Sequence, residues 1–220
     1  MSTCEPANIR ASIDLEGVYW TRDLKVGENV VQFLKAGLPY VSATGLKLVK
    51  DNILEQPAIK ELLRSTFERS LFSYFRGYGH LQGQAYTISR SYKHEPFGGC
   101  LAIQLWMRDS EAIFHHKSHK VRLPAKPSAN GLLEVSQENI KDPIESQHVI
   151  MPDGGWAIVD PRCVFTIEKG FVIIAVFAIE ALISTWKSHM VYPDTPDIRK
   201  LMEEMEDQSI GFNIKLNASQ

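Results

Sequence analysis

Two polar clusters in this sequence combine residue types that can transfer protons. His94 and Glu95 place an imidazole beside a carboxylate, and Asp160 and Arg162 stand two positions apart in a polar corner between apolar runs. A carboxylate next to a cation can form a structural ion pair, or it can face a cavity as a tuned base or an anchor. We expect His94 and Asp160 to be the proton-transfer residues, with Arg162 binding substrate.

Polar side chains alternate with apolar ones along the run 101–108. Gln104, Trp106 and Arg108 share one face of this run, because successive side chains of a strand point to opposite sides. Tyr86 has a comparable position on the preceding run. An apolar wall with a few polar anchors is typical of small-molecule pockets, so we expect Tyr86, Gln104, Trp106 and Arg108 to bind substrate. The alternative is that Gln104 and Arg108 face solvent on an outer sheet.

The densest group of histidines is formed by His115, His116 and His119. On a strand, His115 and His116 would face opposite sides, so regular geometry does not let both bind one metal. We expect a solvated turn with one packed imidazole, and metal ligation is the alternative. The three cysteines are an odd number without metal-like spacing, which predicts reduced, packed thiols.

The composition is that of an ordinary globular protein, with 220 residues, 44% hydrophobic and 23% charged. The net charge of −2 gives no reason to expect nucleic acid or an acidic membrane surface as a partner. The sequence contains no apolar run of about 18 residues, which predicts no membrane-spanning helix. The polar N-terminus lacks an apolar signal core, and we therefore expect a cytoplasmic protein.

The periodicity of apolar residues changes along the chain from helical to alternating. Helices are predicted over residues 23–36, from Pro57 to Gly77, over 179–190 and over 194–205. Strands are predicted over residues 84–90, 101–108, 111–116, 147–151, 156–159 and 171–178. Residues 123–145 are predicted to form a long loop, and the tail from Gly211 to pack back as a strand.

The short spacing of the strands, with Gly, Pro or Asp between them, favours a sandwich or barrel over a parallel α/β sheet. We expect a single domain over residues 1–220. Its parts are a helical N-terminal part (1–80), a barrel (81–178) and a C-terminal helix and tail (179–220).

Two segments carry a resemblance to a known family. Residues 101–123 contain an apolar strand that leads to the corner Lys117-Ser118-His119-Lys120, and residues 151–177 contain a tight turn, a short strand and a long apolar return strand. This order resembles phytanoyl-CoA-hydroxylase-like oxygenases, which depend on Fe(II) and 2-oxoglutarate. The resemblance covers about the C-terminal two-thirds of the chain. It implies an α+β, mainly β fold: a double-stranded β-helix, or cupin-like jelly-roll barrel, preceded and flanked by helices.

The residues that the family uses for its chemistry are missing from the matching positions. The family holds ferrous iron with a His-x-Asp or His-x-Glu pair and a distant histidine, and binds oxoglutarate with an arginine. The resemblance places the first pair at His94-Glu95-Pro96, where the third residue is a proline that cannot ligate. Phe165 stands near the expected distant histidine, and the return strand contains no arginine. We therefore expect no metal and no cofactor.

These observations predict an enzyme that keeps the barrel and its pocket without the iron chemistry. We expect a metal-independent cyclase or isomerase that performs a tailoring step of secondary metabolism on a mainly apolar small molecule. One alternative is an active Fe(II)/2-oxoglutarate oxygenase with non-standard ligands, and another is a non-catalytic binding or partner protein. A homodimer through exposed sheet edges or the terminal helix stays open.

Overall fold

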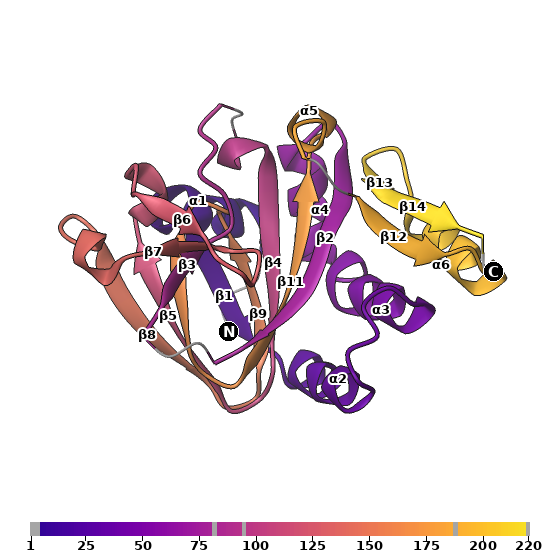
Figure 1. The fold of residues 1–220 in the computed structure, drawn as a ribbon, viewed down its shortest axis with the longest axis horizontal. Coiled ribbons are helices and arrows are strands. Elements are labelled where there is room, and N and C mark those ends of the chain that lie inside the picture. The colour runs from indigo at the N-terminus through magenta and orange to yellow at the C-terminus, as the bar shows by residue number, and fades with distance from the viewer. Residues whose placement is uncertain (1–4, 81–82, 94–95, 187–188, 219–220) are drawn as a thin grey trace.

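Two six-stranded sheets face each other in this protein (Figure 1). The computed structural model describes residues 5–80, 83–93, 96–186 and 189–218. The first sheet has the strand order β1-β9-β4-β11-β2-β13, and the second has the order β6-β7-β3-β10-β5-β8. A small two-stranded sheet, β12-β14, lies beside them.

The strands of the first sheet are antiparallel except for β13, which runs parallel to β2. Their bounds are β1 Val18–Arg22, β2 Ser70–Gly79, β4 Cys100–Trp106, β9 Gly155–Val159, β11 Phe171–Ala178 and β13 Ile210–Phe212. The strands of the second sheet are β3 Ala85–Thr87, β5 Ser110–His116, β6 Ala125–Pro127, β7 Leu133–Val135, β8 Glu145–Met151 and β10 Val164–Lys169. The small sheet pairs β12 Met190–Pro193 with β14 Ile214–Asn217.

The chain passes repeatedly from one sheet to the other. It crosses from β2 to β3, from β4 to β5, from β8 to β9 and from β10 to β11. This alternation is the winding of a double-stranded β-helix, and the predicted fold class of a mainly β jelly roll with flanking helices is confirmed.

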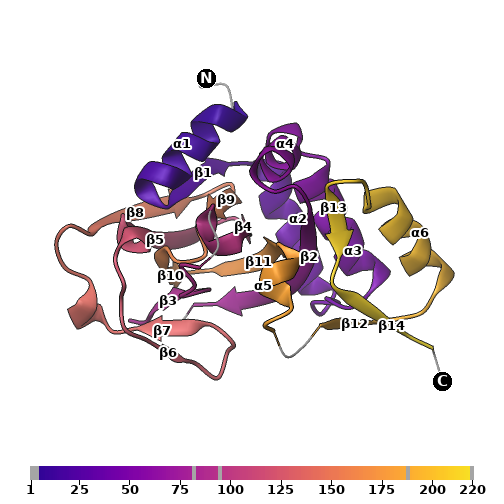
Figure 2. The same ribbon diagram turned by 90° about the horizontal axis from the view of Figure 1, so that it is seen from above.

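Helices cover the outer face of the first sheet, while the second sheet lies on its other side (Figure 2). The helices are α1 Pro6–Glu16, α2 Leu24–Lys35, α3 Ala43–Val49, α4 Pro57–Thr66, α5 Glu180–Ile183 and α6 Pro196–Met205. Asp23 caps α2 by accepting a hydrogen bond from the Val26 N–H at 3.1 Å, and Thr195 caps α6. The predicted helices over 23–36 and 194–205 are confirmed.

The two faces of the first sheet contribute to two different cores. On β4, Leu101, Ile103 and Leu105 pack against the helices, whereas Trp106 packs into the space between the sheets. Because side chains alternate along a strand, each buried strand of this sheet is apolar on both faces. The core between the sheets is the interior of the barrel.

Several predicted elements are corrected by the structure. The helix predicted from Pro57 to Gly77 is wrong beyond Thr66: the chain turns and forms β2, whose aromatic residues serve both cores. β4 ends at Trp106, so Arg108 lies outside the strand. The segment 123–145 carries the short strands β6 and β7, and β1 and β10 were not predicted. The strand-like tail is confirmed as β13 and β14. Among the described residues, no helix is long and apolar enough to cross a membrane.

Candidate functional site

The two ends of the barrel differ in the length of their connections. At the turn end, Trp106 pairs with both Gly155 and Val172, and short turns join β4 to β5, β8 to β9 and β10 to β11. At the other end, here called the mouth, Cys100 pairs with Ala178. The mouth is formed by the longer segments 88–93, 117–123, 160–163 and 179–186 (Figure 1).

The interior of the barrel is filled by aromatic side chains. Tyr86, Trp106, Phe114 and Phe165 are all within 1% of complete burial. Phe165 on β10 stands between Tyr86 on β3 and Phe114 on β5 in the sheet register. The Trp106 and Phe114 rings meet edge to face with their centroids 6.2 Å apart. This part of the barrel is a packed core.

The described residues do not fit iron or oxoglutarate. Phe165, at the position that the resemblance gives to the distant histidine, is fully buried. On β11, Val172, Ile174 and Val176 fill the interior face where an arginine would project. In the part of the chain that the structure describes, no group of three His, Cys, Asp or Glu side chains could hold a metal ion. No catalytic step through either group follows from these residues.

Of the residues predicted to bind substrate, three lie in the packed interior. The Trp106 indole donates to Gln104 Oε1 at 3.1 Å, and the Tyr86 hydroxyl donates to Gln84. Gln104 is fully buried, and its Nε2 has no hydrogen-bond partner in the described structure. Arg108 is exposed in the turn after β4, at the turn end. The expectation that it shares the inward face with Gln104 and Trp106 is therefore wrong, because the strand ends first.

Asp160 and Arg162 form an ion pair at the mouth. Arg162 Nε lies 2.9 Å from Asp160 Oδ1, and Nη2 lies 2.7 Å from Oδ2, so the pair is bidentate. The Arg162 backbone N–H also donates to Oδ1 at 2.9 Å, and the Cys163 N–H donates to the Asp160 carbonyl at 2.8 Å. Asp160 is 0% exposed and Arg162 is 9% exposed. A tight corner between β9 and β10 thus holds both charges in one geometry. His94, the second proton-transfer candidate, lies outside the described residues.

Tyr92 connects this ion pair to the rest of the mouth. Two guanidinium groups lie over its ring, Arg162 at 5.1 Å and Arg122 at 5.2 Å from the ring centroid. Its hydroxyl donates to the Val121 carbonyl at 2.8 Å. Burial raises the pKa of Tyr92 above its ordinary value, so the phenol stays protonated at neutral pH.

Two cavities open at the mouth, and Tyr92 lines both. The smaller, of about 330 Å³, is lined by Asp14, Tyr92, Phe97, His119, Lys120, Asp160 and Arg162. The larger, of about 690 Å³, is here called the basic mouth cavity. It is lined by Ser89, Arg90, Ser91, Tyr92, Lys93, Arg122, Leu123, Leu182, Thr185 and Trp186. Three of these residues are cations, and none of the lining side chains is acidic.

His119 borders the smaller cavity as a neutral imidazole. It is 4% exposed, and burial lowers its pKa. Its Nε2 lies 3.3 Å from the Asp14 carbonyl, while Nδ1 is buried without a partner in the described structure. Gly17, at φ +90°, faces this ring, and a Cβ there would stand 2.5 Å from Nδ1.

The three clustered histidines have separate surroundings. His115 Nδ1 lies 2.8 Å from Ser146 Oγ, whereas His116 Nδ1 lies 3.0 Å from Glu16 Oε2.

Three residues of the mouth were not predicted from the sequence as site residues: Tyr92, Arg122 and Trp186. The sequence signal for Tyr92 and Arg122 was the clustering of cations just after β3 and just before β6, and these two segments lie together only in the folded chain.

Comparison with solved structures identifies the class of fold. The iron-bound structure of HygX from Streptomyces hygroscopicus is 12% identical, with 87% of this chain and 93% of that chain covered and a TM-score of 0.53. The epimerase SnoN in complex with Fe3+, alpha ketoglutarate and nogalamycin RO is 11% identical, with 79% and 83% covered and a TM-score of 0.52. The apo form of ThoJ, a non-heme monooxygenase, is 11% identical, with 77% of this chain and 76% of that chain covered and a TM-score of 0.50.

These likenesses show the fold. No protein-family model and no curated protein matches the sequence. The chain therefore has the jelly-roll fold found in non-heme iron and oxoglutarate oxygenases.

Proposed function

We propose that this chain is a tailoring enzyme of secondary metabolism that catalyses a non-oxidative step, such as an isomerisation or cyclisation, at the barrel mouth. The observation that carries the proposal is the contrast at β10. Phe165, at the position that the resemblance gives to an iron ligand, is fully buried, whereas Asp160 and Arg162, just before the strand, border a cavity. A cavity of about 330 Å³ thus lies beside the corner that precedes β10. SnoN, a protein of this fold, is named an epimerase, which supports isomerisation as the reaction class; its structure holds Fe3+ and alpha ketoglutarate, so the metal-independent part of the proposal rests on the residues of this chain.

The side chains of the mouth suit a reaction in which negative charge develops on the substrate. Arg162 is held by Asp160 through two side-chain hydrogen bonds, so its guanidinium is oriented before any ligand arrives. Preorganised cations of this kind stabilise a developing enolate or alkoxide without reorganising during the reaction. In this proposal Arg162 and Tyr92 contact the substrate, and Asp160 is a positioning residue.

The proton-transfer role of His94 is part of the proposal on its sequence position alone. Asp160 is the weaker candidate for a base, because both of its carboxylate oxygens accept hydrogen bonds from Arg162. Tyr86, Gln104 and Trp106 then act as the packed interior behind the mouth.

The test uses metabolites that accumulate in a strain lacking the gene. The purified protein is incubated with this extract without oxygen and with a chelator, and the products are followed by mass spectrometry. We expect one compound to be replaced by an isomer or by a product that has lost water. Stoichiometric iron in the active protein together with oxoglutarate-dependent succinate formation would falsify the metal-independent reading. A product carrying an added oxygen atom would do the same.

A further inference from the structure

We infer that the basic mouth cavity binds a small organic anion, a carboxylate or a phosphate ester, that carries a planar apolar ring. As a statement about the substrate, this inference rests on the proposed function. As a statement about binding, it rests on the charges, hydroxyls and rings that line the cavity.

The first argument is uncompensated positive charge. Arg90, Lys93 and Arg122 line the cavity, and no ion pair within 4.0 Å involves any of them in the described part of the chain. Elsewhere many basic side chains are paired, as Lys50 is with Glu204 at 2.6 Å. The whole chain carries a net charge of −2, so this gathering of cations is local. Such a site attracts anions and raises their local concentration.

The second argument is that two of these cations are held in place. Arg90 donates to the Ala125 carbonyl, and the Arg122 guanidinium lies over the Tyr92 ring. An arginine already held by stacking loses less freedom when it binds a carboxylate or phosphate. Lys93 and Arg122 are both exposed, but only Arg122 is held over an aromatic ring, so we expect Arg122 to contribute more to binding than Lys93.

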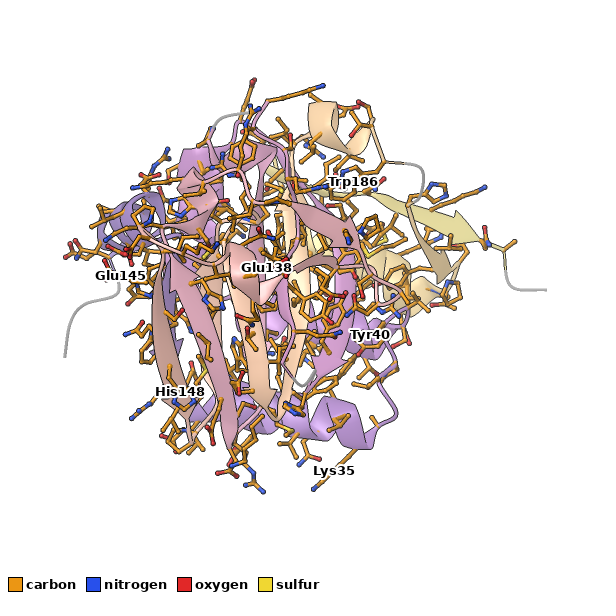
Figure 3. All side chains as sticks on the ribbon, turned by 60° about the vertical axis from the view of Figure 1, so that its left-hand side comes forward. Lys35, Tyr40, Glu138, Glu145, His148 and Trp186 are labelled. Carbon is orange, nitrogen blue, oxygen red and sulfur yellow. The ribbon has the colours of Figure 1, made fainter. Side chains whose placement is uncertain are left out.

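The third argument concerns the rest of the ligand. Leu182 and the half-buried Trp186 give the cavity an apolar wall, and Ser89, Ser91 and Thr185 add hydroxyl groups. Trp186 belongs to the mouth end of the molecule (Figure 3). The volume of about 690 Å³ is within the usual range for a small-molecule site. A ligand could stack a flat ring against Trp186 and place an anionic group near Arg122, and so contact both the apolar and the basic sides of the cavity.

Isothermal titration calorimetry with three probes tests the inference. The probes are phenyl phosphate, 3-phenylpropanoate and the neutral alcohol 3-phenylpropanol. We expect at least one anion to bind about tenfold or more tightly than the alcohol, with affinity that falls as salt is added. The tighter of the two anions identifies the carboxylate or the phosphate as the preferred group.

Variants of the full-length protein locate the site. Arg122→Gln is expected to weaken anion binding about tenfold while leaving the alcohol unaffected. Lys35→Gln is the matched control, because Lys35 ends α2 far from the mouth (Figure 3). Circular dichroism and the thermal midpoint confirm that both variants fold. Equal binding of anions and alcohol, or equal affinity in the two variants, overturns the inference.

The failure of this inference can be separated from failure of the proposed function. Arg122-dependent anion binding with no conversion of any metabolite supports the anion site and argues for a non-catalytic binding protein. Conversion of a neutral metabolite at an unchanged rate in Arg122→Gln supports the enzyme and overturns the anion site as the place where the substrate binds.

Discussion

The interior and the mouth of the barrel differ in the polar side chains that they contain. In the interior, aromatic and aliphatic groups surround Phe165, and the single amide of Gln104 is only half satisfied. At the mouth, Asp160 and Arg162 satisfy each other, and cations line an open cavity. The interior is therefore a packed core, and the mouth carries the open cavities of the candidate site.

The physical reason for this contrast is access to water. A charge in the closed interior would lose its hydration without gaining a partner, which costs several kcal/mol, on the order of 2–7 even for a neutral polar group. The mouth keeps solvent within reach and supplies rigid loop corners that hold charges in pairs. Phe165, at the position that the resemblance gives to a histidine, is part of this closed interior.

The largest expected effect is in the interior. Phe165→Ala should lower the free energy of unfolding by about 3–5 kcal/mol, since it leaves a cavity that its neighbours cannot fill. Urea denaturation followed by circular dichroism measures this loss. Phe171→Ala is the control, because Phe171 is half-buried at the start of β11, and we expect a loss of about 1–2 kcal/mol. Equal losses in the two variants would contradict a tightly packed interior.

At the mouth, the ion pair is expected to matter slightly less. Asp160→Asn should cost about 3 kcal/mol, because it removes one charge of a buried, bidentate ion pair. The exposed pair Asp194–Arg199, with Nε 2.5 Å from Oδ1, offers a comparison. Asp194→Asn should cost much less, because solvent screens this pair. Similar values for both variants would show that the Asp160 pair is not buried in solution.

Acid should weaken the fold through His115, on the second sheet near the mouth. Burial lowers the pKa of His115 from 6.5 to about 4. The unfolded chain therefore binds a proton at pH values where the folded chain does not, so stability falls as the pH drops from 6.5 towards 4. The loss attributable to this group is on the order of 3 kcal/mol near the lower end.

His115→Gln removes this titration. Urea denaturation near neutral pH and near pH 5 should show a smaller acid loss in the variant than in the native protein. An unchanged difference between the two pH values would assign the acid sensitivity to other groups.

The smallest effect is expected at Gln104. Gln104→Met removes a buried amide whose Nε2 lacks a partner, but it also removes the acceptor of the Trp106 indole. These two contributions oppose each other, so we expect stability to change by less than about 1 kcal/mol. Anion binding measured by calorimetry should also be unchanged. A loss of anion binding in this folded variant would place the ligand in the interior and not at the mouth.

Much of the fold was predictable from local pattern. The return strand β11 is a continuous apolar run that suits burial on both faces, and α2 shows its cap and its glycine stop in the sequence. β2 was not predictable in this way, because its aromatic residues also match a helical stripe. The segment is extended because it pairs with β11 in the first sheet and packs against the helices on one face and the barrel interior on the other.

The sequence by itself determined the class of fold and the absence of a histidine at Phe165 or an arginine on β11, since these depend on local period and residue type. The proximity of Asp160 and Arg162 was also predictable, because they are two residues apart in one corner of the chain. The tertiary structure alone decided the site. Tyr92 and Arg122 lie on separate segments that come together only in the folded barrel. Arg108 does not point into the barrel with Gln104, because β4 ends at Trp106.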